Sequence, residues 1–380
     1  MKIFDRLYGD IKFPEIILDL LNCPGLLRLK EVRMANNPFV AFPAFATASR
    51  YEHSIGVCYL AGICGDALGL NEMDKMELMI AGLYHDVGTP PFAHAMEEVL
   101  QAKFGFDHET NLKNLIIGTT GRFDGEFAQI FQGEGLKLRS VCQNGAARKL
   151  GIDLYRIADL SVGNPNDKLS PLINGNGMDL DNIDNIFRAS SAMGLISYNS
   201  GEIAKQLARA FVLKEDELFY DGGHLNEIHE WQRVRDVQYS AIFDSIDDFA
   251  YQTMIKKALR LLLEDDSLVS LDESAWRLTD SSMTYEYLLK HAKSAQIMQR
   301  VVLCRPYECL GILYVEGPGI TKFINRELDY IEEVASRFFI DILGVSKENK
   351  ECSEEYRPVV ANFFPDKRKR CLKRKTLFMG

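Results

Sequence analysis

The sequence has little of what would place the protein in a membrane or outside the cell. Its 380 residues contain no apolar run that approaches the roughly 18 to 20 residues needed to cross a bilayer, and the N-terminal stretch MKIFDRLYGD has no signal-peptide apolar region. Its eight cysteines show no CxxC spacing, and most lie in apolar surroundings. We therefore expect a cytoplasmic protein that does not contact a membrane and whose cysteines are reduced core residues.

Positive charge is also scarce, because the net charge is -10. A surface that coats nucleic acid needs Lys and Arg to displace counterions from phosphates, so the composition argues against one. The exception is the C-terminal run KRKRCLKRK (367–375), which could contact nucleic acid or another anionic partner, although short basic tails are commonly only solvated. At 47% hydrophobic and 26% charged residues, the chain has the composition of a globular protein with one large core and a smaller appendage.

Apolar periodicity predicts a mainly α-helical protein. Helical spacing of three and four residues occurs over 50–70 and 74–86, and VGTPP stops the second helix. Pro91 suits the first turn of the next helix, over 91–104, and helical patterns return at 181–195 and through 226–264.

Two regions depart from this helical pattern. Residues 118–178 are rich in Gly, Asn and Asp and predict an irregular insertion that can include a hairpin. The C-terminal part predicts a strand over 309–317 and then a helix over 325–343. We therefore expect a helical core over 1–300 and a small mixed α/β region over 301–380.

The stretch GLYHDVGTPPFAHAMEE (82–98) concentrates chemistry in a chain that has seven histidines. It holds His85, Asp86, His94 and Glu97, and an Asp after a His at a helix end is costly to bury without a positive charge nearby. A metal ion supplies that charge. With His53, which opens the buried stripe of the 50–70 helix, and one further Asp, the mixed nitrogen and oxygen donors suit Fe, Mn, Zn or Co. The ordinary interpretation stays open: a lone buried histidine is commonly a core residue, and an HD pair can occur by chance.

Four motifs in order resemble a known family. SRYEHSIGV, HDVGTPPFAH, HET and MDLDNIDNIFR are similar to the motifs of the HD-domain deoxynucleoside triphosphate triphosphohydrolases. The lead-in segments LLNCPGLLRLKEVRM and FPAFATASRYEHS extend the likeness over about residues 1–245. The resemblance implies the helical HD-domain fold of metal-dependent phosphohydrolases.

The resemblance implies a metal centre and a set of catalytic side chains. The metal ligands would be His53, His85, Asp86 and Asp181, with Asp184 as the alternative to Asp181 because both belong to a D-x-x-D pattern. The catalytic residues would be His94, Glu97 and His108. The i, i+3 spacing of His94 and Glu97 places both on one helix face, where the carboxylate can orient an imidazole that acts as general acid. Spacing alone also fits a solvated charge at Glu97 and a helix-capping neighbourhood at His108.

The substrate side of the site departs from the family pattern. Arg50 matches a substrate-contacting arginine, while Asn182 and Asn185 stand where phosphate-contacting Lys and Tyr occur. Met34 replaces a Gln that contacts the nucleoside, Ala189 replaces a sugar-contacting Asp, and Thr89 stands where many members have a second histidine. We expect these changes to relax or alter nucleoside selectivity, unless Met34 and Ala189 never reach the substrate.

The expected activity is metal-dependent hydrolysis of (deoxy)nucleoside triphosphates to nucleoside and tripolyphosphate, with Mg²⁺ as a possible second ion on the phosphates. The resemblance further implies a homo-oligomer, a possible nucleotide activator, and contacts between subunits or with nucleotide near Arg28 and Lys30. Two alternatives remain. One is another HD-type phosphohydrolase, acting as a nucleotidase or phosphodiesterase, and the other is a nucleotide sensor without turnover, against which the presence of both His94 and Glu97 argues.

Overall fold

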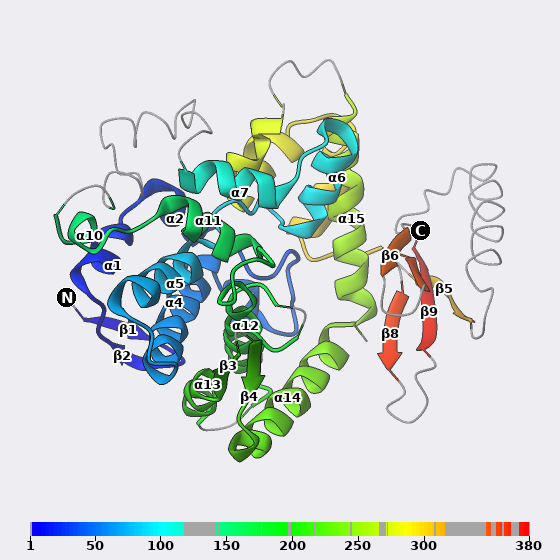
Figure 1. The fold of residues 1–380 in the computed structure, drawn as a ribbon. Helices are drawn as coiled ribbons and strands as arrows, with labels where there is room; N and C mark the ends of the chain where they lie inside the picture. Colours follow the sequence, from blue (N-terminus) through cyan, green and yellow to red (C-terminus); the bar gives the residue numbers. More distant parts are fainter. Residues whose placement is uncertain are drawn as a thin grey trace. The chain divides into compact units, whose positions relative to one another are not determined.

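The structure is a computed structural model. It describes residues 2–117, 142, 145–175, 177–196, 199–215, 217–243, 245–265, 271 and 273–307, followed by the backbone of five short strands between 309 and 379 (Figure 1). The chain forms two compact units. The first comprises 1–35, 41–238 and 270–283, and the second comprises 36–40, 239–269 and 284–380.

The first unit is mainly helical and carries all of the expected site residues. Helix α4 (Arg50–Ala67) is its central element and packs against α5 (Glu72–Tyr84), α12 (Leu180–Ala192) and α13 (Ser200–Arg209). The other elements are β1 (Ile3–Asp5), β2 (Gly9–Ile11), α1 (Glu15–Leu20), α2 (Pro24–Arg28), η1 (Leu29–Glu31), α3 (Pro43–Ala46), α6 (His94–Phe104), α7 (His108–Ile117), α10 (Gly145–Leu150), α11 (Leu154–Val162), η2 (Ser170–Leu172), β3 (Phe211–Lys214), β4 (Glu217–Tyr220), η3 (Gly222–His224), α14 (Leu225–Phe243), η4 (Glu273–Arg277) and α16 (Asp280–Ser282).

The three central helices begin at polar caps that the sequence supplies. The side chains of Ser49, Asn71 and Asp179 accept hydrogen bonds from the backbone N–H groups three residues on, at the starts of α4, α5 and α12. Helices α4 and α5 also approach closely at Gly82, where an added Cβ would lie 3.1 Å from Val57 Cγ1. These caps and this close packing define where His53, His85 and Asp181 emerge.

The second unit is described by helices and separate strands. Its helical elements are α15 (Ile246–Leu263), the π-helix η5 (Met283–Leu288) and α17 (Ala295–Val302), and α15 packs against α17. Strands β5 (Cys309–Val315), β9 (Leu372–Met379) and β8 (Ala361–Pro365) form an antiparallel sheet in that order, while β6 (Lys347–Lys350) pairs with β7 (Glu355–Pro358).

The sequence predicted the helices over 50–70, 74–86 and 181–195 and the strand near 309–317, and the structure contains them as α4, α5, α12 and β5. The helix expected over 325–343 lies outside the described residues. The basic run is described only from Leu372 onward, where it enters strand β9.

Several local expectations were wrong. The third helix begins at His94 and excludes Pro91, because the chain turns sharply at Phe92 and Ala93. The irregular insertion contains helix α11, which the capping Asp153 starts. By contrast, the helical pattern over 226–264 is confirmed by α14 and α15, and the boundary between core and C-terminal region at residue 300 stays a prediction. Cys304 is exposed, whereas Cys23, Cys58, Cys64 and Cys142 are buried as expected.

A buried ion pair joins α5 to α11 and predicts a large effect on stability. The Arg156 guanidinium binds Glu77, Asp74 and Asp167, and Glu77 is fully buried. We expect Arg156→Ala to lower the free energy of unfolding by about 3 kcal/mol, because it leaves a buried carboxylate without its cation. Urea unfolding would measure this loss.

The matched control is Lys113→Ala, which removes the half-exposed ion pair between Lys113 of α7 and Asp159 of α11, the helix that also carries Arg156. That variant should lose about 0 to 1 kcal/mol. Equal losses in the two variants would contradict a specific role for burial of Glu77.

Candidate metal centre and catalytic pair

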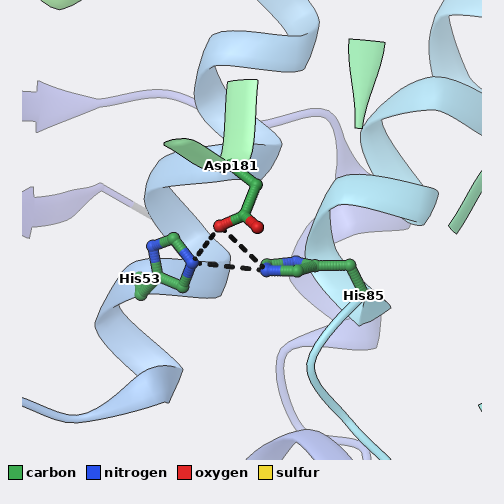
Figure 2. Close-up of side chains that lie close together, drawn as sticks. All are labelled: His53, His85 and Asp181. Carbon is green, nitrogen blue, oxygen red and sulfur yellow. Dashed lines mark hydrogen bonds and ion pairs between the residues drawn. The ribbon is translucent and has the colours of Figure 1, made fainter. Parts of the chain in front are cut away.

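Three side chains from two helices and the end of a third converge on one point. His53 lies in α4, His85 directly follows α5, and Asp181 lies in the first turn of α12 (Figure 2). The Nε2 atoms of the two histidines are 3.3 Å apart, and Asp181 Oδ1 lies 2.8 Å from His53 Nε2 and 3.6 Å from His85 Nε2. His53, His85 and Asp181 therefore form a group that could hold one metal ion.

Asp86 borders this group. Its Oδ2 lies 3.7 Å from His85 Nε2 and 4.0 Å from His53 Nε2. One nitrogen of Arg50 donates to both oxygens of Asp86 at 2.7 Å, and the Thr89 hydroxyl donates to Oδ1 at 3.0 Å. Burial alone would raise the pKa of Asp86, but Arg50 and the two histidines outweigh burial and hold that pKa below its usual value.

Asp184, the alternative fourth ligand, lies on the other side of the His53 ring. Its Oδ2 is 2.7 Å from Nδ1 of His53, the nitrogen that faces away from Asp181. The structure therefore brings Asp181 together with the two histidines, whereas Asp184 contacts only the opposite nitrogen of His53.

The three side chains His53, His85 and Asp181 could hold a divalent transition metal, and Asp86 borders them. Their nitrogen and oxygen donors lie 2.8 to 3.6 Å apart, and none is a thiolate. Burial alone would lower the pKa of His53, but its hydrogen bonds with Asp181 and Asp184 raise it to about 10, so the carboxylates attract positive charge to this point. The Asp181 side chain is 36% exposed, whereas that of His53 is 3% exposed, so solvent reaches the group from the α12 side.

A second group forms at the start of α6. Nδ1 of His94 lies 3.1 Å from Glu97 Oε2, and Nδ1 of His108, which begins α7, binds the other oxygen of Glu97. Burial would raise the pKa of Glu97, but the hydrogen bonds from His108 and His94 lower it to about 2. The bond with Glu97 in turn raises the pKa of His108. The sequence predicted the pair His94–Glu97, and the structure places His108 on the same carboxylate.

The side chains that we expected to contact substrate differ from one another in burial and in hydrogen-bond partners. Arg50 is bound to Asp86, and the Asn182 amide donates to Asp179. Met34 and Asn185 are half-buried. Ala189, which stands where the family has a sugar-contacting Asp, is 0% exposed, in agreement with the alternative that this side chain does not reach the substrate.

Arg28 also differs from expectation. We expected it at a subunit or nucleotide contact, but it is 1% exposed and donates to the carbonyl oxygens of Val87, Thr89, Trp276 and Leu278. Arg28 therefore ties the segment after the HD pair to η4 and the residue that follows it. Nearby, the ammonium of Lys30 lies over the Tyr51 ring.

The turn before His94 is strained. Phe92 and Ala93 have positive φ angles of 57° and 46°, which non-glycine residues rarely adopt. Asp280, 5% exposed, accepts hydrogen bonds from the backbone N–H of Phe92 and of Arg33. Burial raises the pKa of Asp280, and the two N–H groups oppose that shift. The sequence showed no sign of this role, because 188 positions separate Phe92 from Asp280.

We expect Asp280→Ala to destabilise the protein by about 1 to 3 kcal/mol for each N–H group left without an acceptor. Asp280→Asn retains one acceptor oxygen and should lose less. Thermal and urea unfolding would measure both variants. If the alanine variant were as stable as the wild type, Asp280 would not be what holds the strained turn.

Comparison with known proteins identifies the fold. Residues 50–127 match the HD domain family, over a segment that contains His53, His85, Asp86 and the His94–Glu97 pair. The chain carries an HD domain.

Relatives of this HD-domain chain extend the likeness. A deoxynucleoside triphosphate triphosphohydrolase SAMHD1 homolog from Dictyostelium discoideum is 26% identical over 320 residues, which are 79% of this chain and 58% of that protein. The SAMHD1 triphosphohydrolases of Mus musculus and Homo sapiens are 35% and 34% identical over 105 residues, 26% of this chain and 16% and 17% of theirs. The chain thus spans less than two thirds of the length of these relatives.

A solved structure has a similar fold. A hypothetical protein from Aquifex aeolicus superposes with a TM-score of 0.68 at 20% identity, covering 100% of this chain and 96% of the other. Among the described residues, no helix has both the length and the apolar character to cross a membrane.

Proposed function

We propose that this chain is a metal-dependent phosphohydrolase that converts (deoxy)nucleoside triphosphates to nucleoside and tripolyphosphate. The observation that supports this proposal most is the convergence of His53 and His85, both within the segment that matches the HD domain, with Asp181 of α12, bordered by Asp86. Similar proteins include triphosphohydrolases. The ligands would be His53, His85, Asp86 and Asp181. They suit Mn, Fe, Zn or Co, and Mg²⁺ could additionally bind the substrate phosphates.

A metal bound there would polarise a phosphate oxygen or lower the pKa of a water molecule. Orientation of Asp86, stabilisation of phosphate charge and protonation of the leaving group are assigned to side chains of this protein. Arg50 and Thr89 hold Asp86 in its orientation. Because Arg50 is also a cation beside the metal centre, it can stabilise negative charge on a phosphate that approaches.

The reaction breaks the bond between the α-phosphorus and the 5′-oxygen. Water supplies the new oxygen on phosphorus, and the leaving 5′-oxygen takes up a proton. His94 is the proposed donor: its Nδ1–H donates to Glu97, which leaves Nε2 to deliver the proton. Glu97 stays ionised because its pKa is about 2, and His108 fixes its second oxygen.

The proposal is tested by incubating the metal-loaded protein with each dNTP and NTP, singly and in mixtures, and by separating nucleoside, nucleotides, tripolyphosphate and phosphate. Nucleoside with tripolyphosphate supports the proposal. Monophosphate or diphosphate products would replace it with another HD-type phosphohydrolase. Binding without turnover of any nucleotide would indicate a sensor.

Two further features belong to the proposal. A single nucleotide that is hydrolysed only in the presence of a second one would reveal the nucleotide activator that we expect. The homo-oligomer would be detected by light scattering with and without nucleotide. The location in the cytoplasm stays a prediction.

A further inference from the structure

Asp184 is surrounded by partners although it stands outside the metal-binding group. Its Oδ2 faces His53 Nδ1 at 2.7 Å, and its Oδ1 accepts a hydrogen bond from the Tyr8 hydroxyl at 2.7 Å. Arg188, one turn further along α12, donates to both oxygens at 2.8 and 3.0 Å. The side chains of Asp184 and Arg188 are both 0% exposed. A carboxylate bound on every side in this way has one available orientation.

The N-terminal hairpin completes this arrangement. Asp5, at the end of β1, accepts hydrogen bonds from the backbone N–H of Leu7 and Tyr8 and lies 3.0 Å from Arg188. The Asp5 carboxylate thus stabilises the turn that carries Tyr8 and also pairs with the Arg188 guanidinium. Residues 3–11 therefore reach the ring of His53 through Tyr8 and Asp184, although they provide no residue of the metal-binding group.

Helix α4 leaves room for this contact at Gly56. A Cβ at this position would lie 2.0 Å from Asp184 Oδ1 and 2.4 Å from a nitrogen of Arg188. Glycine inside a helix costs roughly 0.5 to 1 kcal/mol relative to alanine. Its presence one turn after His53 is explained by the approach of the Asp184–Arg188 pair to that histidine.

The contact sets the role of Nδ1 when a metal is bound at Nε2. The Asp184 carboxylate accepts a hydrogen bond from Nδ1–H of His53, which leaves Nε2, the nitrogen that faces Asp181 and His85, as the atom that would bind the metal. Histidines that bind metals through one nitrogen usually donate the other N–H to a carboxylate, which raises the basicity of the ring and fixes its orientation.

We propose that Asp184, held by Tyr8 and Arg188, is the positioning residue that fixes the tautomer and orientation of His53, so that the N-terminal hairpin sets the affinity of the metal centre. The inference rests on the proposed metal centre but not on the proposed reaction. Its readout is metal affinity measured without nucleotide, so it can fail or succeed independently of triphosphohydrolase activity.

The test compares Mn²⁺ binding by the full-length wild type with binding by the variants Tyr8→Phe and Asp184→Asn. Calorimetry and electron paramagnetic resonance would measure the binding. Loss of such a partner typically weakens metal binding about 10- to 100-fold, which we expect for Asp184→Asn, and we expect a smaller loss for Tyr8→Phe. One ion should still bind at saturating Mn²⁺, because no ligand is removed.

The matched control is Tyr59→Phe. The Tyr59 ring lies 5.3 Å from that of Tyr8, so the variant removes a neighbouring hydroxyl without touching Asp184, and it should bind Mn²⁺ as the wild type does. Circular dichroism would establish that each variant is folded. Tyr8→Phe changes a single oxygen and serves as the readout if Asp184→Asn does not fold.

A spectroscopic measurement separates positioning from a merely structural role. In the Zn²⁺-loaded protein, ¹H–¹⁵N spectra of the imidazoles should show His53 protonated at Nδ1, and Asp184→Asn should reduce or shift that signal. Unchanged Mn²⁺ affinity in both Tyr8→Phe and Asp184→Asn would overturn the proposal. Complete loss of Mn²⁺ in Asp184→Asn, with full binding in Asp181→Ala, would also overturn it, because Asp184 would then be a ligand.

Discussion

Asp181→Ala is expected to lose its tightly bound metal and its activity together. Asp181 Oδ1 lies within 3.6 Å of both histidine nitrogens, so its removal takes a charged donor from the centre of the group. The two imidazoles would then face each other without the carboxylate between them, and metal binding depends on a complete set of deprotonated ligands. Metal content by mass spectrometry and nucleotide turnover would be measured on the same preparation. Asp86→Ala should behave in the same way.

The control for this prediction is Asp66→Ala. Asp66 is an exposed carboxylate on the same helix as His53 and pairs with Lys75, so the variant changes the net charge equally and leaves the site intact. It should retain metal and activity. Full metal content in both Asp181→Ala and Asp86→Ala would contradict the proposed ligand set.

His94→Ala should keep its metal and still bind nucleotide, while the rate falls by about 10² to 10⁴, the range usual for a general acid. The side chain of His94 is 87% exposed and its ring bonds to Glu97, so its removal leaves the metal-binding group and the core in place. Glu97→Gln should lose less, because it weakens the hold on His94 and His108 without removing either imidazole. Single-turnover rates with metal content measured in parallel would test both variants.

A suitable control for the catalytic pair is His224→Ala. His224 forms an i, i+3 pair with Asp221 that resembles the His94–Glu97 pair in spacing, but it lies in η3. Its loss should leave the rate unchanged. A fully active His94→Ala enzyme would show that another group protonates the leaving oxygen.

The pH dependence of the rate provides a related check. The pKa of Glu97 is held at about 2, so the carboxylate is ionised at any pH at which the protein would be assayed. Protonation of Glu97 therefore cannot cause a fall in rate between pH 7 and pH 5, and any such fall in the wild type should also occur in Glu97→Gln. If the fall were present in the wild type and absent from the variant, the ionised state that we assign to Glu97 would be wrong.

Local spacing was sufficient to predict helices α4, α5 and α12, but not the start of α6 at His94. The apolar repeat of α4 places His53 on its buried side. The i, i+3 spacing of His94 and Glu97 likewise predicted their contact, which the structure contains. These features depend on residues three or four positions apart, for which helix geometry alone determines proximity.

The sequence by itself thus predicted helices α4, α5 and α12 and the HD motif, and its resemblance to a family pointed to His53, His85 and Asp181 as residues that could bind a metal. Tertiary structure alone decided that Asp184 lies behind His53 with Tyr8, that Arg28 is buried against four carbonyl groups, and that Asp280 holds the turn before His94. These contacts join residues from 59 to 250 positions apart, and a hydrogen bond between such distant groups leaves no periodic pattern in either segment. The packing of α4, α12 and the N-terminal hairpin brings Asp184 to His53 and Tyr8, whereas Arg28 of α2 and Asp280 of α16 reach their partners in the segment 87–92 through other packing contacts of the first unit.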